Sequence, residues 1–379
     1  MSRLASRMVV MPRALAKALR GRRPPQDPAR ILIAHHLLLG DTLMLAALLA
    51  RLRRRYPRAT IDITTSPACL PLFAGRPYGA HAIPWDPHHP GLTRAVTRRG
   101  PYDLAFVPGE NRHALLARAA GARWVVALDR DTPGWKNRIV DELVPWPGAP
   151  ANLADIFASL AGPGDEAFAP GDWPAPHAAP IETPADPYAV LHVGAGSPLR
   201  YWPAERWRAL AAHLAGRGLQ VVWSAGPGEE ALVESIDPDR RHRSLAGKLD
   251  LAQLWHLLAS AALLVVPDTG VAHLAKLTAT PTVCLFGPGS DVLFGPGRYW
   301  RAQRFAAVIA PDFPCRDQRT VFKRDIAWVR RCQRGTDRCA APACMHALDL
   351  ARVVDACDRV LAPCRENPGH PSPLSRNPP

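Results

Sequence analysis

Several features that would define other classes of protein are missing from this chain of 379 residues. No apolar run approaches the roughly 18 residues that a membrane-spanning helix needs. No unit of roughly 20 to 50 residues recurs, which argues against a solenoid or a propeller. The apolar stretch Met8–Met11 is too short for the core of a secretory signal, and no small-residue cleavage pattern follows it. We therefore expect a cytoplasmic protein without a spanning helix.

Acidic residues are also scarce, with 33 Asp and Glu against 47 Lys and Arg, so the formal net charge is +14. Residues 1–30 hold eight of the basic residues and one acid, and half of the net charge therefore lies in this segment. Leucines and methionines recur there at helical spacing, which fits a basic amphipathic helix on an anionic membrane face. A solvated arm fits the same composition. The charge indicates an anionic partner.

Nucleic acid is one such partner, and a non-catalytic basic nucleic-acid-binding protein is an alternative to an enzyme. The basic residues of the body, such as those of Arg51–Arg55, lie on predicted helices without interleaved aromatics. No nucleic-acid-binding module is recognisable in the sequence. These two observations argue against a nucleic-acid partner, and an acidic glycolipid accounts for the positive charge equally well. We therefore expect no nucleic-acid partner.

Strand and helix patterns alternate along the chain, which predicts an α/β protein with parallel sheets. The length exceeds that at which one core stops growing, and the 47% of hydrophobic residues can fill two cores. Seven prolines between residues 163 and 187 indicate an interdomain linker. Predicted strands include Ile61–Thr64, Leu104–Val107 and Trp124–Leu128, and predicted helices include 42–56, 204–215, 229–235, 251–260 and 271–277. The predicted parts are a basic arm (1–29), an N-terminal domain (30–162), the linker (163–187), a C-terminal domain (188–346), a last helix (347–361) and a disordered Pro-rich tail (362–379).

The predicted strand Val265–Pro267 leads through Asp268, Thr269 and Gly270 into a helix. Free backbone N–H groups and the positive end of the helix dipole make such an N-terminus suitable for a diphosphate. Asp268 or Thr269 could instead be a cap that accepts hydrogen bonds from the first amides, and for this segment alone a cap is the simpler interpretation. A second anion-suited loop upstream favours the diphosphate.

That second loop follows a predicted strand at Leu191 and contains Gly194, Gly196, Ser197 and Arg200. Glycines let the backbone approach a ligand, the serine adds a hydroxyl donor, and the guanidinium can bind a phosphate through two hydrogen bonds. The third glycine of a dinucleotide fingerprint is missing, and Ser-Pro stands where that pattern needs a helix. The loop therefore indicates a phosphorylated ligand and argues against a dehydrogenase.

Two further turns also follow predicted strands. Glu229 either complements the dipole of the next helix or accepts hydrogen bonds from ribose hydroxyls. Gly40 and Asp41 either make an ordinary turn and N-cap or carry chemistry. His35 and His36, which precede them, could face an interdomain cleft as acceptor or base partners.

In their colinear order these motifs resemble glycosyltransferase family 9, the ADP-heptose:lipopolysaccharide heptosyltransferases and their relatives. The resemblance covers roughly residues 30 to 360. It implies a GT-B architecture, in which two Rossmann-like domains with parallel sheets face each other, the nucleotide binds the C-terminal domain and the last helix crosses back to the first domain. The segments that carry it are Gly40-Asp41, Gly194–Trp202, Gly226–Glu229, Leu245–Lys248, Asp268–His273 and Pro281–Pro288.

The resemblance implies an inverting glycosyltransferase that moves a sugar, heptose from ADP-heptose, onto a lipopolysaccharide-core or related glycan acceptor. Asp41 would be the catalytic base, and neither a metal nor another cofactor would be required. The expected partners are the nucleotide-sugar donor, an anionic glycolipid or glycan acceptor and the inner face of the cytoplasmic membrane. A nucleotide-sugar epimerase on the same fold is the alternative enzyme. The implied donor-binding residues are Gly196, Ser197, Arg200, Glu229, Asp268, Thr269, Gly270 and His273.

The chain departs from the family at two of these motifs. Arg200 is followed by Tyr201 where the family usually has lysine before the tryptophan, so the cation is retained in a different side chain. The segment His35–Leu39 stands where the family often has Arg or Asp.

Cys315, Cys332, Cys339 and Cys344 form a cluster in the sequence. The gaps of six and four residues between the last three fit no common spacing of zinc ligands. We expect reduced structural thiols in a cytosolic setting, and a metal site or disulfides are the alternatives.

Overall fold

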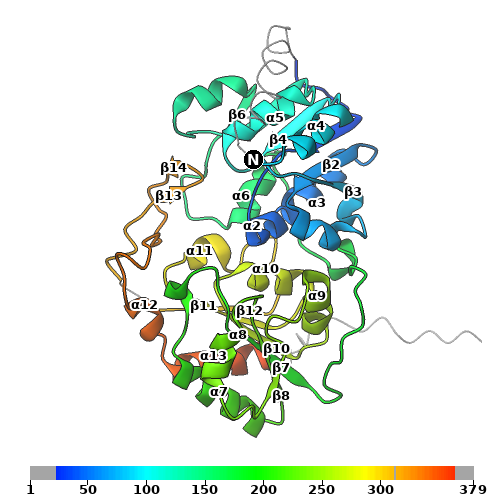
Figure 1. Cartoon of the computed structure of the whole chain (residues 1–379). Coiled ribbons are helices and arrows are strands. Elements are labelled where there is room, and N and C mark those ends of the chain that lie inside the picture. Colours follow the sequence, from blue (N-terminus) through cyan, green and yellow to red (C-terminus); the bar gives the residue numbers. More distant parts are fainter. Residues whose placement is uncertain (1–22, 311–312, 363–379) are drawn as a thin grey trace, which may run out of the picture.

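The computed structural model describes residues 23–310 and 313–362. The chain forms two lobes, and each lobe is built around a six-stranded sheet (Figure 1). Most of the predicted N-terminal arm and of the predicted tail lies outside the described residues. Within the described ranges, no helix is long and apolar enough to cross a membrane.

The first lobe contains a parallel sheet with the strand order β3-β2-β1-β4-β5-β6. Ile31 and Ile33 pack in one apolar cluster and Leu32 in another, because successive side chains of a strand point to opposite faces of the sheet. The strand order reverses between β1 and β4, and ligands bind at such a reversal in open α/β sheets. The strands are β1 Arg30–Ile33, β2 Thr60–Thr65, β3 Ala80–Pro84, β4 Leu104–Val107, β5 Trp124–Leu128 and β6 Glu142–Val144.

The helices of this lobe include one correction to the sequence-based prediction. The predicted helix 42–56 is two helices, α2 and α3, which meet at Leu45. The first of them begins three residues earlier than predicted, so Asp41 lies inside its first turn rather than before it. The cap position is Leu38, whose side chain makes no capping hydrogen bond, and Asp41 is therefore not an N-cap. The helices are α2 Leu39–Met44, α3 Ala46–Arg55, α4 Pro90–Arg99, α5 Ala114–Ala119 and α6 Leu153–Ser159.

The second lobe repeats the arrangement, with the parallel strand order β12-β11-β10-β7-β8-β9. Its strands are β7 Tyr188–His192, β8 Gln220–Ser224, β9 Arg243–Ser244, β10 Leu263–Pro267, β11 Thr282–Phe286 and β12 Phe305–Ile309. Its helices are α7 Ala204–Gly216, α8 Glu230–Ile236, α9 Leu251–Ala259, α10 Gly270–Leu277, α11 Asp291–Phe294, α12 Ala343–His346 and α13 Leu350–Leu361. The short 3-10 helix of this lobe is η6 Pro198–Arg200. The 3-10 helices that precede this lobe in the chain are η1 Pro67–Phe73, η2 Pro77–Gly79, η3 Asn111–His113, η4 Gly134–Ile139 and η5 Pro170–Asp172. The four helices predicted here are confirmed to within one or two residues.

The last helix, α13, does not cross back to the first lobe, so this expectation from the resemblance is wrong. Its apolar stripe of Val353, Ala356, Cys357 and Val360 packs in a cluster with residues of the second lobe only. The spacing of these residues places them on one face of the helix, and that face covers the second sheet.

The two lobes meet where the N-termini of α2 and α10 face each other. A Cβ atom on Gly40 would lie 2.7 Å from Cδ2 of His273, and one on Gly270 would lie 2.9 Å from Cδ2 of Leu39. Glycine is therefore required at both positions for the helices to approach this closely. The Pro-rich segment 163–187 contacts both lobes. Buried Phe168 donates its N–H to the Tyr299 carbonyl of the second lobe at 2.9 Å, and buried Trp173 donates Nε1–H to the Leu72 carbonyl of the first lobe at 2.8 Å.

A segment of the second half returns to the first lobe, and we name residues 313–333 the bridging strap. It contains the antiparallel hairpin β13 Thr320–Val321 and β14 Arg324–Asp325. Figure 1 shows this hairpin beside the first lobe, away from the second sheet. Thr132 of the first lobe donates its hydroxyl to the Lys323 carbonyl at 2.6 Å.

Arg324 anchors the strap, because its side chain is fully buried against the first lobe. Nε donates to the Asp129 carbonyl at 2.6 Å, and Nη1 donates to the Gly109 carbonyl at 3.1 Å. Nη2 donates to the Leu128 carbonyl at 2.9 Å and to Oδ1 of Asn111 at 2.8 Å. One guanidinium thus satisfies several buried acceptors at the ends of β4 and β5.

We expect Arg324→Ala to lower the free energy of unfolding by about 3 kcal/mol, because it leaves buried carbonyl groups without a donor. Thermal and denaturant unfolding measure the change. Arg319→Ala is the matched control, since Arg319 lies on the same strap and pairs with Asp325 at the surface. The control should cost no more than about 1 kcal/mol. Equal costs for the two variants would contradict the anchoring role.

Candidate functional site

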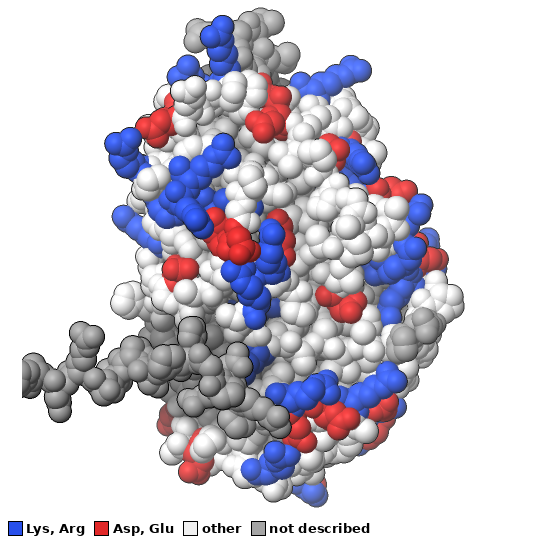
Figure 2. Space-filling model, turned by 180° about the vertical axis from the view of Figure 1, so that it is seen from behind, with Lys and Arg blue, Asp and Glu red and all other residues white. Residues whose placement is uncertain are grey.

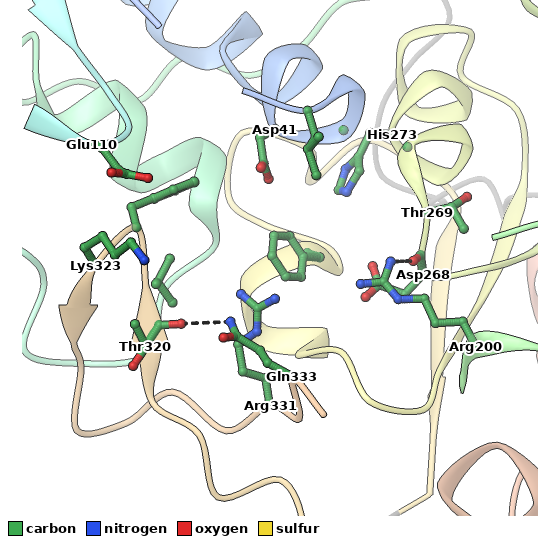
Figure 3. Close-up of a pocket in the computed structure, with 16 residues that line it drawn as sticks. Asp41, Glu110, Arg200, Asp268, Thr269, His273, Thr320, Lys323, Arg331 and Gln333 are labelled. Atoms are coloured by element: carbon green, nitrogen blue, oxygen red, sulfur yellow. Dashed lines mark hydrogen bonds between the residues drawn. The ribbon is translucent and has the colours of Figure 1, made fainter. Parts of the chain in front are cut away.

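A pocket of about 360 Å³ lies between the lobes at the carboxyl ends of their strands (Figure 3). It brings together six of the predicted site residues: Asp41, Arg200, Asp268, Thr269, Gly270 and His273. It does not include Gly196, Ser197 or Glu229. The other lining residues are Leu38, Gly40, Glu110, Phe294, Thr320, Val321, Phe322, Lys323, Arg331 and Gln333.

Asp41 extends into this pocket from the first turn of α2. Burial raises the pKa of its carboxyl group to about 6. The nearby Arg331 lowers this pKa and the nearby Asp268 raises it, and Arg200 makes a smaller lowering contribution. A carboxyl group with a pKa in this range is a better base at neutral pH than an ordinary aspartate.

Asp268 lies directly after β10 and is buried. Its Oδ2 atom has no hydrogen-bond partner among the described residues, and burial raises the pKa of its carboxyl group. Gly289 allows this placement, because a Cβ atom there would lie only 2.0 Å from Oδ2. Arg200 donates Nη1–H to the backbone carbonyl of Asp268, not to its carboxylate. In the described part of the chain, Oδ2 is therefore an unpaired acceptor that lies buried against Gly289, at the wall of the pocket that Asp268 lines.

The N-terminus of α10 begins at Gly270, with Thr269 as its cap. The Thr269 hydroxyl accepts a hydrogen bond from the Val271 N–H at 3.3 Å, so the cap interpretation is correct for Thr269. The capped end still lines the pocket, and the dipole of α10 points its positive end into it. Capping and anion binding are compatible here.

His273 follows in the first turns of α10 and is buried beside Phe294, with ring centroids 6.2 Å apart. Burial lowers the pKa of its imidazole well below the usual value, so the ring is neutral at pH 7. Nδ1 has no partner among the described residues. His273 therefore lines the pocket with a neutral ring and not with a positive charge.

Glu229 connects the two glycine-containing loops of the second lobe. Its carboxylate accepts hydrogen bonds from the Ala195 N–H at 2.9 Å and the Gly226 N–H at 2.8 Å. Gly194 is required for this contact, because a Cβ atom there would lie 2.0 Å from Oε2. The structure thus assigns Glu229 a loop-joining role that neither of the two sequence-based interpretations included.

Ser197 caps the short helix η6, since its hydroxyl accepts from the Leu199 N–H at 3.3 Å. Gly196 precedes it with open space where a side chain would be. Arg200, at the end of η6, is the residue of this loop that reaches the pocket.

His35 and His36 do not line the pocket, so the expectation that they face it is wrong. Nδ1 of His35 accepts from the Leu37 N–H at 3.2 Å, and burial lowers the pKa of its imidazole to about 3. His36 packs edge-to-face against Trp85 at a centroid distance of 5.8 Å.

The bridging strap supplies pocket residues that sequence reasoning missed, among them Thr320, Lys323, Arg331 and Gln333. No pattern in the sequence indicates that this segment returns to the first lobe. Glu110 was also missed, although it closely follows β4 and the carboxyl ends of parallel strands meet at one edge. That rule could have found it.

The described cysteines are all free thiols, including Cys315, Cys332, Cys339 and Cys344. In residues 23–310 and 313–362, no three His, Cys, Asp or Glu side chains are grouped so that they could hold a metal ion.

Two Rossmann-like lobes that face each other across a polar pocket at their strand ends define the GT-B architecture. The family model of glycosyltransferase family 9 (heptosyltransferase) matches residues 97–324, and the chain belongs to this family. The chain is 27% identical over 309 residues to lipopolysaccharide heptosyltransferase 1 of Pseudomonas aeruginosa, with 76% of this chain and 85% of the relative covered. It is 26% identical over 302 residues to lipopolysaccharide heptosyltransferase 2 of Salmonella typhimurium, with 69% and 83% covered.

Solved structures show the same fold. The ADP-heptose lipopolysaccharide heptosyltransferase II of E. coli superposes with a TM-score of 0.65 at 21% identity, covering 88% of this chain and 98% of the other. A family 9 glycosyltransferase from Veillonella parvula superposes with a TM-score of 0.69 at 17% identity, covering 90% and 99%. The predicted family and fold class are confirmed.

The raised pKa of Asp41 predicts a stability difference that depends on pH. The folded chain holds the Asp41 proton up to about pH 6, whereas an unfolded chain loses it near 3.8, the ordinary pKa of an aspartate. The wild type therefore loses stability as the pH rises through about 6, and Asp41→Asn, which cannot ionise, does not. We expect the variant to unfold a few degrees higher at about pH 8 and at the wild-type temperature at about pH 4.

The matched control is Asp239→Asn, since the side chain of Asp239 is 65% exposed. This variant should show no such pH-dependent gain in thermal unfolding experiments. A gain for Asp41→Asn that is the same at both pH values would argue against a raised pKa.

Proposed function

We propose that this protein transfers heptose from ADP-heptose to an anionic acceptor of the lipopolysaccharide-core type, with inversion at the anomeric carbon. The observation that carries the proposal is the shared pocket, in which Asp41 of the first lobe lies opposite Arg200 and the N-terminus of α10 from the second. The relatives named above are lipopolysaccharide heptosyltransferases, and the solved E. coli relative is named for ADP-heptose.

The donor diphosphate binds at the N-terminus of α10 in this proposal. The amides of Thr269 and Gly270, the dipole of α10 and the Arg200 guanidinium all favour negative charge there. Asp268 would repel a phosphate, so the carboxylate that lines the pocket accepts a hydroxyl of the donor sugar instead. The nucleoside extends from the diphosphate toward the loops of Gly196, Ser197 and Glu229.

The reaction is a direct displacement. The acceptor oxygen attacks the anomeric carbon, the bond from that carbon to the diphosphate oxygen breaks on the opposite face, and the hydroxyl proton passes to Asp41. The pKa of about 6 keeps Asp41 mostly ionised at neutral pH and raises its basicity. The products are the glycosylated acceptor and the nucleoside diphosphate.

Negative charge grows on the leaving diphosphate as the bond breaks. Arg200 and the first amides of α10 are preorganised to stabilise that charge. We propose that these groups replace a divalent metal and that no other cofactor takes part.

The surface of the protein carries charged and apolar groups that bear on the nature of the acceptor. Lys and Arg side chains cluster on the face shown in Figure 2, with Asp and Glu side chains between them. Leu38, at the pocket, is 81% exposed and offers an apolar contact beside it. The apolar group at the pocket suits a lipid-linked acceptor, and the net charge of +14 favours an anionic one at the inner face of the cytoplasmic membrane.

Asp41→Ala is expected to abolish acceptor-dependent release of ADP from ADP-heptose while leaving ADP affinity nearly unchanged, because the carboxylate takes the proton and does not hold the nucleotide. Arg200→Ala should weaken both activity and ADP affinity, the latter about tenfold or more. Calorimetric titration with ADP and an assay of released ADP measure the two quantities. ADP affinity that collapses in Asp41→Ala would place Asp41 in the donor site and refute its role as the base.

The same assay separates the proposal from the two alternatives, neither of which the family match favours. Conversion of ADP-heptose to its epimer, with no net release of ADP even when acceptor is present, would indicate an epimerase. Salt-sensitive binding to oligonucleotides without any sugar transfer would indicate a nucleic-acid-binding protein.

Chelators are expected to leave the rate of transfer unchanged, because the cations of the pocket are side chains. The measurement is the initial rate before and after dialysis against EDTA. A rate that falls on dialysis and returns with zinc or another divalent ion would show that a metal is needed.

A further inference from the structure

One buried cation in the pocket is not used by the function proposed above. Arg331 enters the pocket from the bridging strap, which belongs to neither six-stranded sheet. We propose that Arg331 is the second cation of the diphosphate site and binds the donor diphosphate from the side opposite Arg200. The inference rests on the proposed function, because it takes the donor to be a nucleoside diphosphate sugar.

The backbone at Arg331 is held on both sides. Its N–H donates to the Gln318 carbonyl at 3.2 Å, and its carbonyl accepts from the Gln318 N–H at 3.0 Å. The next residue, Cys332, donates its N–H to the Pro288 carbonyl of the second lobe at 2.8 Å. Because the backbone is fixed, the direction in which the side chain enters the pocket is fixed as well. Figure 3 shows the guanidinium extending into the pocket toward Asp41.

The guanidinium of Arg331 has unused hydrogen-bonding capacity. Its Nε is buried and has no hydrogen-bond partner among the described residues. The group lies over the ring of Phe294, 5.8 Å from the centroid, so that one face is covered by an aromatic side chain. The side chain as a whole is only partly buried, so its terminal donors can reach a ligand in the pocket that it lines. Its planar set of donors matches the oxygens of a phosphate.

Arg200 and Arg331 differ in the hydrogen bonds that their guanidinium groups form within the protein. Arg200 already donates Nη1–H to the Asp268 carbonyl, and this bond fixes its position beside β10. Burial lowers the pKa of Arg331, the nearby Asp268 raises it, the nearby Arg200 lowers it, and Asp41 raises it by a smaller amount, so Arg331 is attracted by the two carboxylates and repelled by the other cation. A diphosphate between them would relieve that repulsion and accept hydrogen bonds from both.

The charged groups that act on Arg331 come from three places. Asp41 projects from α2, Asp268 follows β10, and Arg200 ends η6. No hydrogen bond joins Arg331 to either carboxylate among the described residues, although both line the same pocket. A purely structural partner for these aspartates would be expected to form such a bond. The lack of one leaves the donors of Arg331 to an anion that binds between the lobes.

The test is calorimetric titration of the full chain with ADP and with AMP, on the wild type, Arg331→Gln and Arg331→Lys. Removal of one charge-assisted phosphate contact should weaken ADP binding about 10- to 100-fold in Arg331→Gln. Arg331→Lys keeps the charge and should recover part of the affinity. AMP lacks the β-phosphate, so its affinity should fall by less than about threefold. The matched control is Arg330→Gln, since Arg330 is the exposed neighbour on the strap and does not line the pocket.

Several outcomes would overturn the proposal. One is an unchanged ADP affinity in Arg331→Gln together with a shifted pH profile of transfer, which would show that Arg331 acts only on Asp41. An equal loss of ADP and AMP affinity would assign the defect to the pocket as a whole. If Arg331→Gln does not fold, a folded Arg331→Lys that binds ADP more weakly than Arg330→Gln supports the proposal, and an ADP affinity equal to that of Arg330→Gln overturns it. A wild type that binds no ADP would refute the proposed function itself and is thereby distinguished from a failure of this inference.

Discussion

The close contact between the N-termini of α2 and α10 is the constraint on which the site depends. Each helix carries a glycine, Gly40 or Gly270, at a point where a side chain would collide with the opposite helix. The contact brings the carboxylate of Asp41 to the end of a helix whose dipole favours anions. Without it, the proposed base of one lobe and the proposed anion site of the other would be separated by water, and neither could act on a bond held at the other.

The bridging strap adds a second connection between the lobes. Arg324 fixes it to the first lobe through buried carbonyl groups, and Cys332 ties its other end to the second lobe. Between these anchors lie the residues that close one wall of the pocket. The strap therefore belongs to the second half of the chain in sequence and to both lobes in its contacts. A substitution in it can alter ligand binding without touching either sheet.

Much of the fold could be predicted from local patterns. Alternating apolar strands and amphipathic helices lie where the sequence predicts them, because burial of one face depends on residues close together in the chain. The predictions failed where the outcome depended on contacts with residues far away in the sequence or where the local sequence carried no signal. Helix α2 begins at Leu39 and not at Thr42 as predicted, because its N-cap residue, Leu38, has no side chain that can cap a helix and that the sequence could reveal. The last helix stayed on the second sheet, because its apolar stripe fits a cluster that no local pattern describes. His35 and His36 pack inside the first lobe for the same reason.

The sequence by itself determined the class of fold, the family and the residues at the ends of the main strands, among them Asp41, Arg200 and Asp268. These follow from short motifs, in which the residue types and their spacing can be recognised within a few consecutive residues. Only the tertiary structure decided that Arg331 and Lys323 share their pocket and that Glu229 joins two loops instead. The physical reason is that pKa values, unpaired donors and close approaches arise from groups far apart in sequence, and folding alone brings such groups together.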